Sequence, residues 1–215
     1  MKENALHFFL DVLSVILGIV ITFAIQGLID RSRDRKNIHS AMELVRTELA
    51  TNIEDIQIMH DYLLEANRSA QYFLQHSEEL DTCPEDSIEY HGSVLLAEAS
   101  LTTSSDALEL LKSSSLFQKI GDNNLSMKII RAYDCCSSIV SGLNRHLENR
   151  NRQFEESING ETVGIFARKD GVPFREYLKT DYGIYTIRWI ASQTGQFTDT
   201  SEIQEAIDAI EEYLK

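Results

Sequence analysis

VLSVILGIVITFAIQGLI, residues 12–29, is the stretch that decides the fold, because it runs for 18 residues without a charge. A helix of this length spans roughly 27 Å, close to the hydrocarbon core of a bilayer. The alternatives are a cleaved signal peptide and a buried helix of a soluble protein. The apolar run is too long for a signal peptide, and no small-x-small cleavage site follows it. We therefore expect residues 5–30 to form a transmembrane helix that anchors the chain.

One face of this segment carries small and weakly polar residues at spacings of three or four. They are Asp11, Ser14, Gly18, Thr22 and Gln26. Such a stripe lets another membrane helix approach closely and share hydrogen bonds. The competing interpretation is that the two end residues lie at the membrane interfaces and that the small residues between them are incidental. The stripe is therefore a candidate contact surface for a second copy or a partner helix.

Most of the basic residues that flank this segment lie on its C-terminal side. Four follow it directly, namely Arg31, Arg33, Arg35 and Lys36. Because such bases collect on the cytoplasmic side, they place the C-terminal domain in the cytoplasm and the N-terminus outside. The cysteines agree with a reducing compartment, since three thiols with one adjacent pair do not form a disulfide framework; they are Cys83, Cys135 and Cys136.

The remainder of the chain is acidic. Of 34 acids and 20 bases in the whole chain, 30 acids and 15 bases follow residue 36, a formal charge of −15. Such a surface is repelled by phosphate backbones, so we expect no nucleic-acid partner. Only two prolines occur, which favours long helices over a many-turned β fold.

A second periodic pattern continues from the membrane segment. Apolar or small residues recur every 3.5 residues on average at Ile38, Met42, Val45, Leu49, Ile53, Ile56, Met59, Leu63, Ala66, Ala70 and Phe73. This is the seam period of helices that supercoil together, as in a coiled coil. Residues 31–79 are therefore expected to form a long juxtamembrane helix. Its seam requires a partner, either a second copy or the chain's own soluble domain, on which we expect the helix to pack.

The rest of the chain divides into two parts, residues 80–102 and residues 103–215. An acidic loop is expected over 76–90, and a short apolar segment follows it within the first part. The second part is expected to be a helical soluble domain. Three helix starts carry capping residues, namely Thr103 with Asp106, Asp122, and Ser201 with Gln204. The corresponding helices run to about Ser113, to Asn159–Gly160 and to Leu214, with another over 182–193 and an irregular stretch over 160–179. The fold class is mainly α: one N-terminal transmembrane helix continuing into a long helix, then an α-helical bundle domain.

The run TTSSDALELLKSSSLFQKIGDNNLSMKIIRAYD, residues 102–134, resembles a core pattern of uncharacterised bacterial single-pass membrane proteins. The matching positions are Ser105, Leu111, Lys112, Ser113, Ser114, Ile120, Asp122 and Tyr133. This family usually has Asn-rich or Trp-containing residues after its membrane helix, where this chain has residues 30–33, DRSR. The resemblance implies a helical fold and a membrane location, a single pass through the bacterial inner membrane. It implies no activity.

Motifs for catalysis or cofactor binding do not occur in the sequence. There is no glycine-rich phosphate loop, no pair of histidines at helical spacing and no nucleophile motif, so we expect no enzyme, cofactor or metal. The most distinctive polar cluster is Lys112, Ser113 and Ser114. It is either a polar site for an acidic ligand group or simply the C-terminus of a helix.

Two functional hypotheses follow. The first is a membrane-anchored helical interaction module, a scaffold or accessory signalling partner, with membrane lipid and a protein partner or second copy as its contacts. The second is a membrane-tethered small-ligand sensor whose pocket lies between helices near Lys112, Tyr185 and Trp189.

Overall fold

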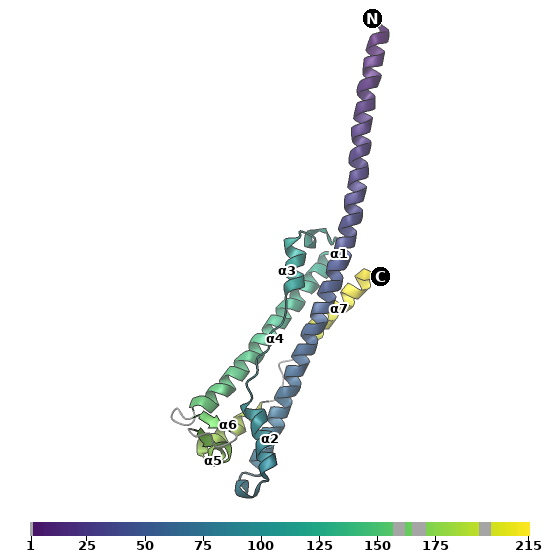
Figure 1. Ribbon diagram of the computed structural model, residues 1–215. Helices are drawn as coiled ribbons and strands as arrows, with labels where there is room; N and C mark the ends of the chain where they lie inside the picture. Colours follow the sequence, from purple (N-terminus) through teal and green to yellow (C-terminus); the bar gives the residue numbers. More distant parts are fainter. Residues whose placement is uncertain (1, 157–161, 165–170, 194–198) are drawn as a thin grey trace.

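The computed structural model describes residues 2–156, 162–164, 171–193 and 199–215, with side chains described for 14–154, 174–193 and 199–215. Helix α1 runs unbroken from Lys2 to Gln75, 74 residues, or about 110 Å. Neither glycine nor proline follows Gly27 within it, so nothing interrupts the helix where the apolar segment ends. Figure 1 shows its first part projecting alone from a helical domain that packs along the remainder.

The other described elements are short except for α4. They are η1 (Leu80–Thr82), α2 (Glu85–Leu96), α3 (Asp106–Ser113), η2 (Phe117–Lys119), α4 (Asn123–Glu156), β1 (Thr162–Gly164), β2 (Gly171–Pro173), α5 (Phe174–Leu178), α6 (Asp181–Ser192) and α7 (Ser201–Leu214). The two strands pair in parallel, with Val163 opposite Val172. The protein is thus mainly α, a long N-terminal helix followed by a helical domain.

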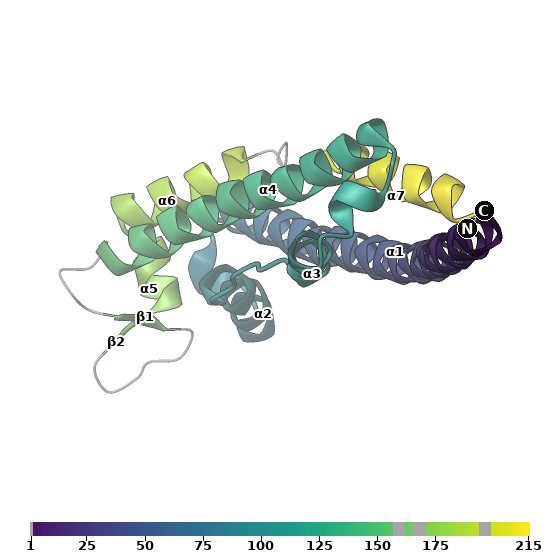
Figure 2. The same cartoon turned by 90° about the horizontal axis from the view of Figure 1, so that it is seen from above.

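The seam of α1 is covered by the chain's own helices. Its first part, from Ile38 to Met59, packs with α3, α4 and α7 in a proximal core, the one nearer the apolar segment. Its second part, from Ala66 to Phe73, packs with α2, α5 and α6 in a distal core, and Figure 2 shows these elements grouped around α1. All eleven seam residues are buried or partly buried. A second copy therefore cannot form a coiled coil through this seam.

Helix α2 corrects the expected loop over 76–90. It begins at Glu85, directly after Pro84, whose φ of −55° already suits a first helical turn. Glu85 and Asp86 place negative charge at the positive end of the helix dipole. Ile88 and Leu95 then bury the helix in the distal core, which stabilises it despite its acidic sequence.

The caps of the later helices agree only in part with expectation. Asp122 caps α4 as predicted, because its Oδ1 accepts the amides of Asn124 and Leu125 at 2.8 and 3.0 Å. The capping box expected at Ser201 is wrong, since Ser201 is the first residue of α7 and its own amide donates to Asp199 Oδ1 at 3.0 Å. Helix α4 is described to Glu156, and the expected stop at Asn159–Gly160 lies outside the described residues. The stretch expected to be irregular contains α5 and the two strands.

Candidate functional site

The projecting part of α1 is predominantly apolar and uncovered. Every large apolar side chain that is described there is more than half exposed: Val15, Ile16, Leu17, Ile19, Val20, Ile21, Phe23, Ile25, Leu28 and Ile29. In the described part of the chain, this is the one helix long and apolar enough to cross a membrane. An apolar surface of this extent marks a site of contact with lipid or protein.

The small-residue stripe lies on one face of this segment. Gly18 is open, since a Cβ added there would meet no atom within 4 Å. Thr22 donates its hydroxyl to the carbonyl of Gly18 at 2.8 Å, so the threonine presents its methyl group outward. Ser14 and Gln26 are also on exposed surface, whereas the side chain of Asp11 lies outside the described residues. The described part of the stripe is therefore exposed, and at Gly18 no side chain covers the helix backbone.

The same face continues along α1 into the soluble domain. At 100° per residue, Ile58 follows Thr22 by 36 residues, or ten full turns, so the two side chains lie on the same face of the helix. Thr51 lies only about 20° around the helix axis from Thr22. Leu44 and Ile58 are 51% and 63% exposed there, and they lie opposite the buried seam. Thr47 and Thr51 donate their hydroxyls to the carbonyls four residues earlier, at 2.8 and 3.1 Å. We call Leu44, Thr47, Thr51 and Ile58 the outward strip of α1.

The polar cluster at the end of α3 has the geometry of a helix C-terminus. Lys112, Ser113 and Ser114 are exposed, and the two serine hydroxyls donate to the carbonyls of Leu110 and Leu111, at 3.2 Å each. Ser115 then adopts the left-handed conformation, with φ of 59°. The serines are thus used by the backbone of their own helix.

The pocket expected near Lys112, Tyr185 and Trp189 is not assembled. Helix α3 meets α1 at Glu48, whereas α6 meets it at Asn67. These contact points are 19 residues apart, about 28 Å along the helix. Tyr185 is exposed, and Trp189 instead stacks on His146 with ring centroids 5.2 Å apart.

The carboxylate of Glu48, on α1, forms a polar site with groups from α3, α4 and the segment before α3. Glu48 accepts the hydroxyls of Ser104 and Tyr133, each at 2.5 Å, and the amide of Ala107 at 3.1 Å. Burial alone raises the pKa of this carboxyl, but these hydrogen bonds together outweigh burial and lower the pKa below its ordinary value. Burial, followed by the bond to Glu48, raises the pKa of Tyr133. Glu48 therefore caps α3 in place of the expected Thr103–Asp106 pair, which is wrong.

Two asparagines fix the extended segment that precedes α3. Asn52 of α1 exchanges a pair of hydrogen bonds with the backbone of Ser104, at 2.9 and 3.0 Å. Asn144 of α4 does the same with Leu101, at 2.8 and 2.9 Å. Each asparagine side-chain amide thus hydrogen-bonds to the segment as the backbone of a neighbouring β-strand would. It satisfies backbone groups that would otherwise lack partners. Together with Glu48, they bind the segment between α1 and α4 as a rigid part of the domain.

A hollow of about 360 Å³ lies beside this segment. Hydroxyl groups dominate its lining, which includes Thr102, Thr103, Ser104, Ser105, Tyr133, Ser137 and Ser141. Two hydroxyls of this lining already donate to Glu48. The described residues that line the hollow include no histidine, lysine, arginine or acid.

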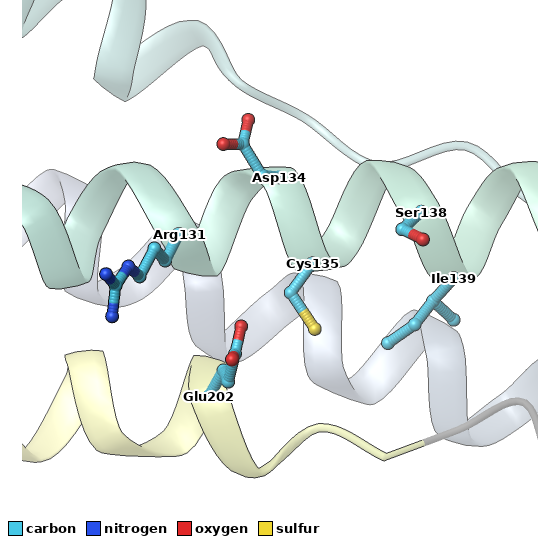
Figure 3. Close-up of a pocket in the computed structure, with 6 residues that line it drawn as sticks. All are labelled: Arg131, Asp134, Cys135, Ser138, Ile139 and Glu202. Carbon is cyan, nitrogen blue, oxygen red and sulfur yellow. The ribbon is translucent and has the colours of Figure 1, made fainter.

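A second hollow of about 430 Å³ lies between α4 and α7 (Figure 3). Figure 3 shows Glu202 of α7 pointing toward α4, between Arg131 and Cys135. The sulfur of Cys135 lies 3.7 Å from the carbonyl oxygen of Asp199. Burial, and then the acids Glu202 and Asp199, raise the pKa of this thiol. A raised pKa disfavours the thiolate, which is the nucleophilic form of cysteine.

Comparisons of this chain with family models, with curated proteins and with solved structures gave no match. The described residues contain no group of three histidine, cysteine or acidic side chains that would hold a metal ion.

Sequence reasoning missed the Glu48 site, although one signal was present. Asn52 follows the seam residue Leu49 by three positions and precedes Ile56 by four, so it falls on the buried face of α1. A polar residue at such a position requires a hydrogen-bond partner and therefore marks a buried polar contact.

Proposed function

We propose that this chain is a membrane-anchored helical module that acts through protein contact, as a scaffold or accessory signalling subunit. The observation that carries the proposal is the continuity of α1. One uninterrupted helix presents a bare apolar segment and then forms the spine of both cores. A contact made in the membrane is thereby coupled to the soluble domain through a rigid helix instead of a flexible linker.

The exposed segment supports membrane insertion energetically. Ten large side chains, each more than half exposed to solvent, would leave water on insertion. At about 1 kcal/mol for each, this transfer stabilises the inserted state by on the order of 10 kcal/mol. The full chain is expected to stay in the membrane pellet during alkaline carbonate extraction. Release into the supernatant would contradict the anchor.

The partner we propose is a second copy, joined in parallel through the stripe and the outward strip. The seam is already occupied, and the face opposite to it continues from Gly18 to Ile58. Gly18, Thr22, Thr47 and Thr51 on that face are small and allow two helices to approach closely, whereas Arg33 and Lys36 lie on the same side and separate the stripe from the outward strip. Two copies in one membrane share the same direction, so the same face of each can meet across a two-fold axis.

Disulfide crosslinking in membranes tests this pairing, with neighbouring positions as the matched control. In a Cys135→Ser background, Thr51→Cys places a thiol on the outward strip, and Ala50→Cys places one about 100° away on equally exposed surface. We expect a crosslinked dimer for Thr51→Cys alone, and a lower yield when Gly18→Leu is added. Equal crosslinking at both positions, or none at Thr51→Cys, would refute the arrangement.

The orientation we propose places the soluble domain in the cytoplasm, following the bases after the membrane segment. We propose the bacterial inner membrane on the basis of the family resemblance. Cys83 is buried and cannot report sidedness, whereas Glu78 is exposed on the loop after α1. In the Cys135→Ser background, Glu78→Cys should react with an impermeant maleimide in inverted vesicles and stay unlabelled in intact spheroplasts. The reverse pattern would overturn the orientation.

A further inference from the structure

Two arginines directly follow the apolar segment, on the side of α1 on which the soluble domain packs. Arg31 and Arg35 precede Ile38 by seven and three residues, so they share the side of α1 on which the domain packs. Both are exposed, and neither makes an ion pair with any described residue. They lie about 3 and 9 Å beyond Ile29 along the helix axis. The headgroup layer of a bilayer is roughly 5–8 Å thick, so both guanidinium groups can reach it.

The soluble domain removes the negative charge nearest to these arginines. Asp34 lies between them in the sequence, and Lys119 of η2 binds its carboxylate at 2.8 Å. Asp30 is likewise paired, with Arg33 at 3.2 Å. We call residues 30–36 together with Lys119 the collar. It contains five bases and two acids and therefore carries a net charge of +3. The folded domain therefore makes the collar more positive than the local sequence is.

This local charge contrasts with the rest of the molecule, which is strongly acidic after residue 36. Each base near an anionic bilayer contributes about 1 kcal/mol of attraction, and this attraction falls off within a Debye length of about 8 Å. The collar directly follows the apolar segment, so its first residues lie within that distance of the surface of a membrane that encloses the segment. Guanidinium groups also match the phosphate oxygens of a headgroup with paired hydrogen bonds.

We propose that Arg31 and Arg35, beneath the membrane-facing end of the domain, bind the headgroups of anionic phospholipids, with Lys119 neutralising Asp34. The site selects phosphatidylglycerol-type lipids over zwitterionic lipids in the layer that contacts the protein. This inference rests on the membrane anchoring proposed above and adds the lipid class that the anchor prefers.

The test uses the full chain reconstituted in phosphatidylcholine vesicles with a trace of spin-labelled phosphatidylglycerol or spin-labelled phosphatidylcholine. The ratio of the motionally restricted fractions measures selectivity. We expect the wild type to favour phosphatidylglycerol several-fold at low salt and to lose this preference near 1 M salt, where the Debye length is about 3 Å. Arg31→Gln with Arg35→Gln should bring the ratio close to one. Arg145→Gln with Arg152→Gln, an equal charge change at exposed positions far along α4, should leave it unchanged.

A second comparison isolates the contribution of the fold. Lys119→Gln leaves Asp34 uncompensated and should lower the selectivity, whereas Lys112→Gln removes an exposed lysine without an ion pair among the described residues and should not. Equal effects of these two variants would overturn the role of Lys119. Carbonate extraction of the same vesicles separates the two proposals. A resistant wild type without lipid selectivity refutes the headgroup site alone, and an extractable wild type refutes the anchor as well.

Discussion

Replacement of Glu48 tests whether one carboxylate joins α1, α3 and α4. The side chain accepts two hydroxyls and one backbone amide, all charge-assisted hydrogen bonds. Each such bond contributes about 1.5–3 kcal/mol, and partial exposure places these at the lower end. Glu48→Ala should therefore lower the free energy of unfolding by about 3 kcal/mol. Glu48→Gln keeps one acceptor oxygen and should lower it by about half as much.

The assay is urea unfolding of the full chain in mild detergent, followed by the fluorescence of Trp189, the only tryptophan. A double-mutant cycle with Tyr133→Phe isolates the bond between Glu48 and the tyrosine hydroxyl, and its coupling energy should be about 1–1.5 kcal/mol. A cost below about 0.5 kcal/mol for Glu48→Ala would refute the assigned role.

The pH dependence gives an independent check. The hydrogen bonds lower the pKa of Glu48 in the folded protein below the ordinary value of 4.5. A lowered pKa contributes stability that is fully present above the unfolded value and is lost as the pH falls through the folded value. The difference in stability between wild type and Glu48→Gln should therefore be constant above about pH 5.5 and shrink below about pH 4.5. A difference that persists undiminished at pH 3 contradicts this account.

Substitutions at three further positions test other parts of the fold by the same unfolding assay. Gly183→Ala places a Cβ 2.1 Å from the carbonyl oxygen of Tyr177 and should cost about 3 kcal/mol; a cost under about 1 kcal/mol would mean that α5 and α6 are not packed so closely. Ser115→Gly relieves the left-handed conformation and should stabilise the domain by about 0.5 kcal/mol, whereas Ser115→Val should destabilise it. Arg150 is fully buried, donates Nη2 to the carbonyl of Ala97 at 2.7 Å and has no described partner for Nε or Nη1. Arg150→Met should leave stability within about 1 kcal/mol of wild type while Arg150→Ala lowers it by about 3 kcal/mol, and equal losses would argue that the charge itself is required.

Much of the helical framework could be predicted because its signals are local. The uninterrupted apolar run, the seam from Ile38 to Phe73 and the cap at Asp122 are properties of neighbouring residues on one helix. Loop boundaries were less predictable at α2, since burial of Ile88 and Leu95 stabilises a helix in a segment that looks like an acidic loop. Propensity alone does not include that tertiary contribution.

The Glu48 site could not be predicted, because its partners are remote in sequence. Ser104 and Tyr133 follow Glu48 by 56 and 85 residues, and no spacing rule links them. The same holds for Lys119, which reaches Asp34 across 85 residues. Three-dimensional packing brings these groups together, and it converts a basic run with an internal acid into a collar of higher net charge.

The amino-acid sequence by itself determined that α1 is one long helix, apolar where a membrane would enclose it and amphipathic beyond, because hydrophobic spacing acts within a few turns. It also determined that the seam must be covered, but a spacing of 3.5 residues does not say by what. Only the tertiary structure decided that question. The chain's own helices fill the seam, so the opposite face of α1 is the one that stays exposed, as Leu44 and Ile58 show.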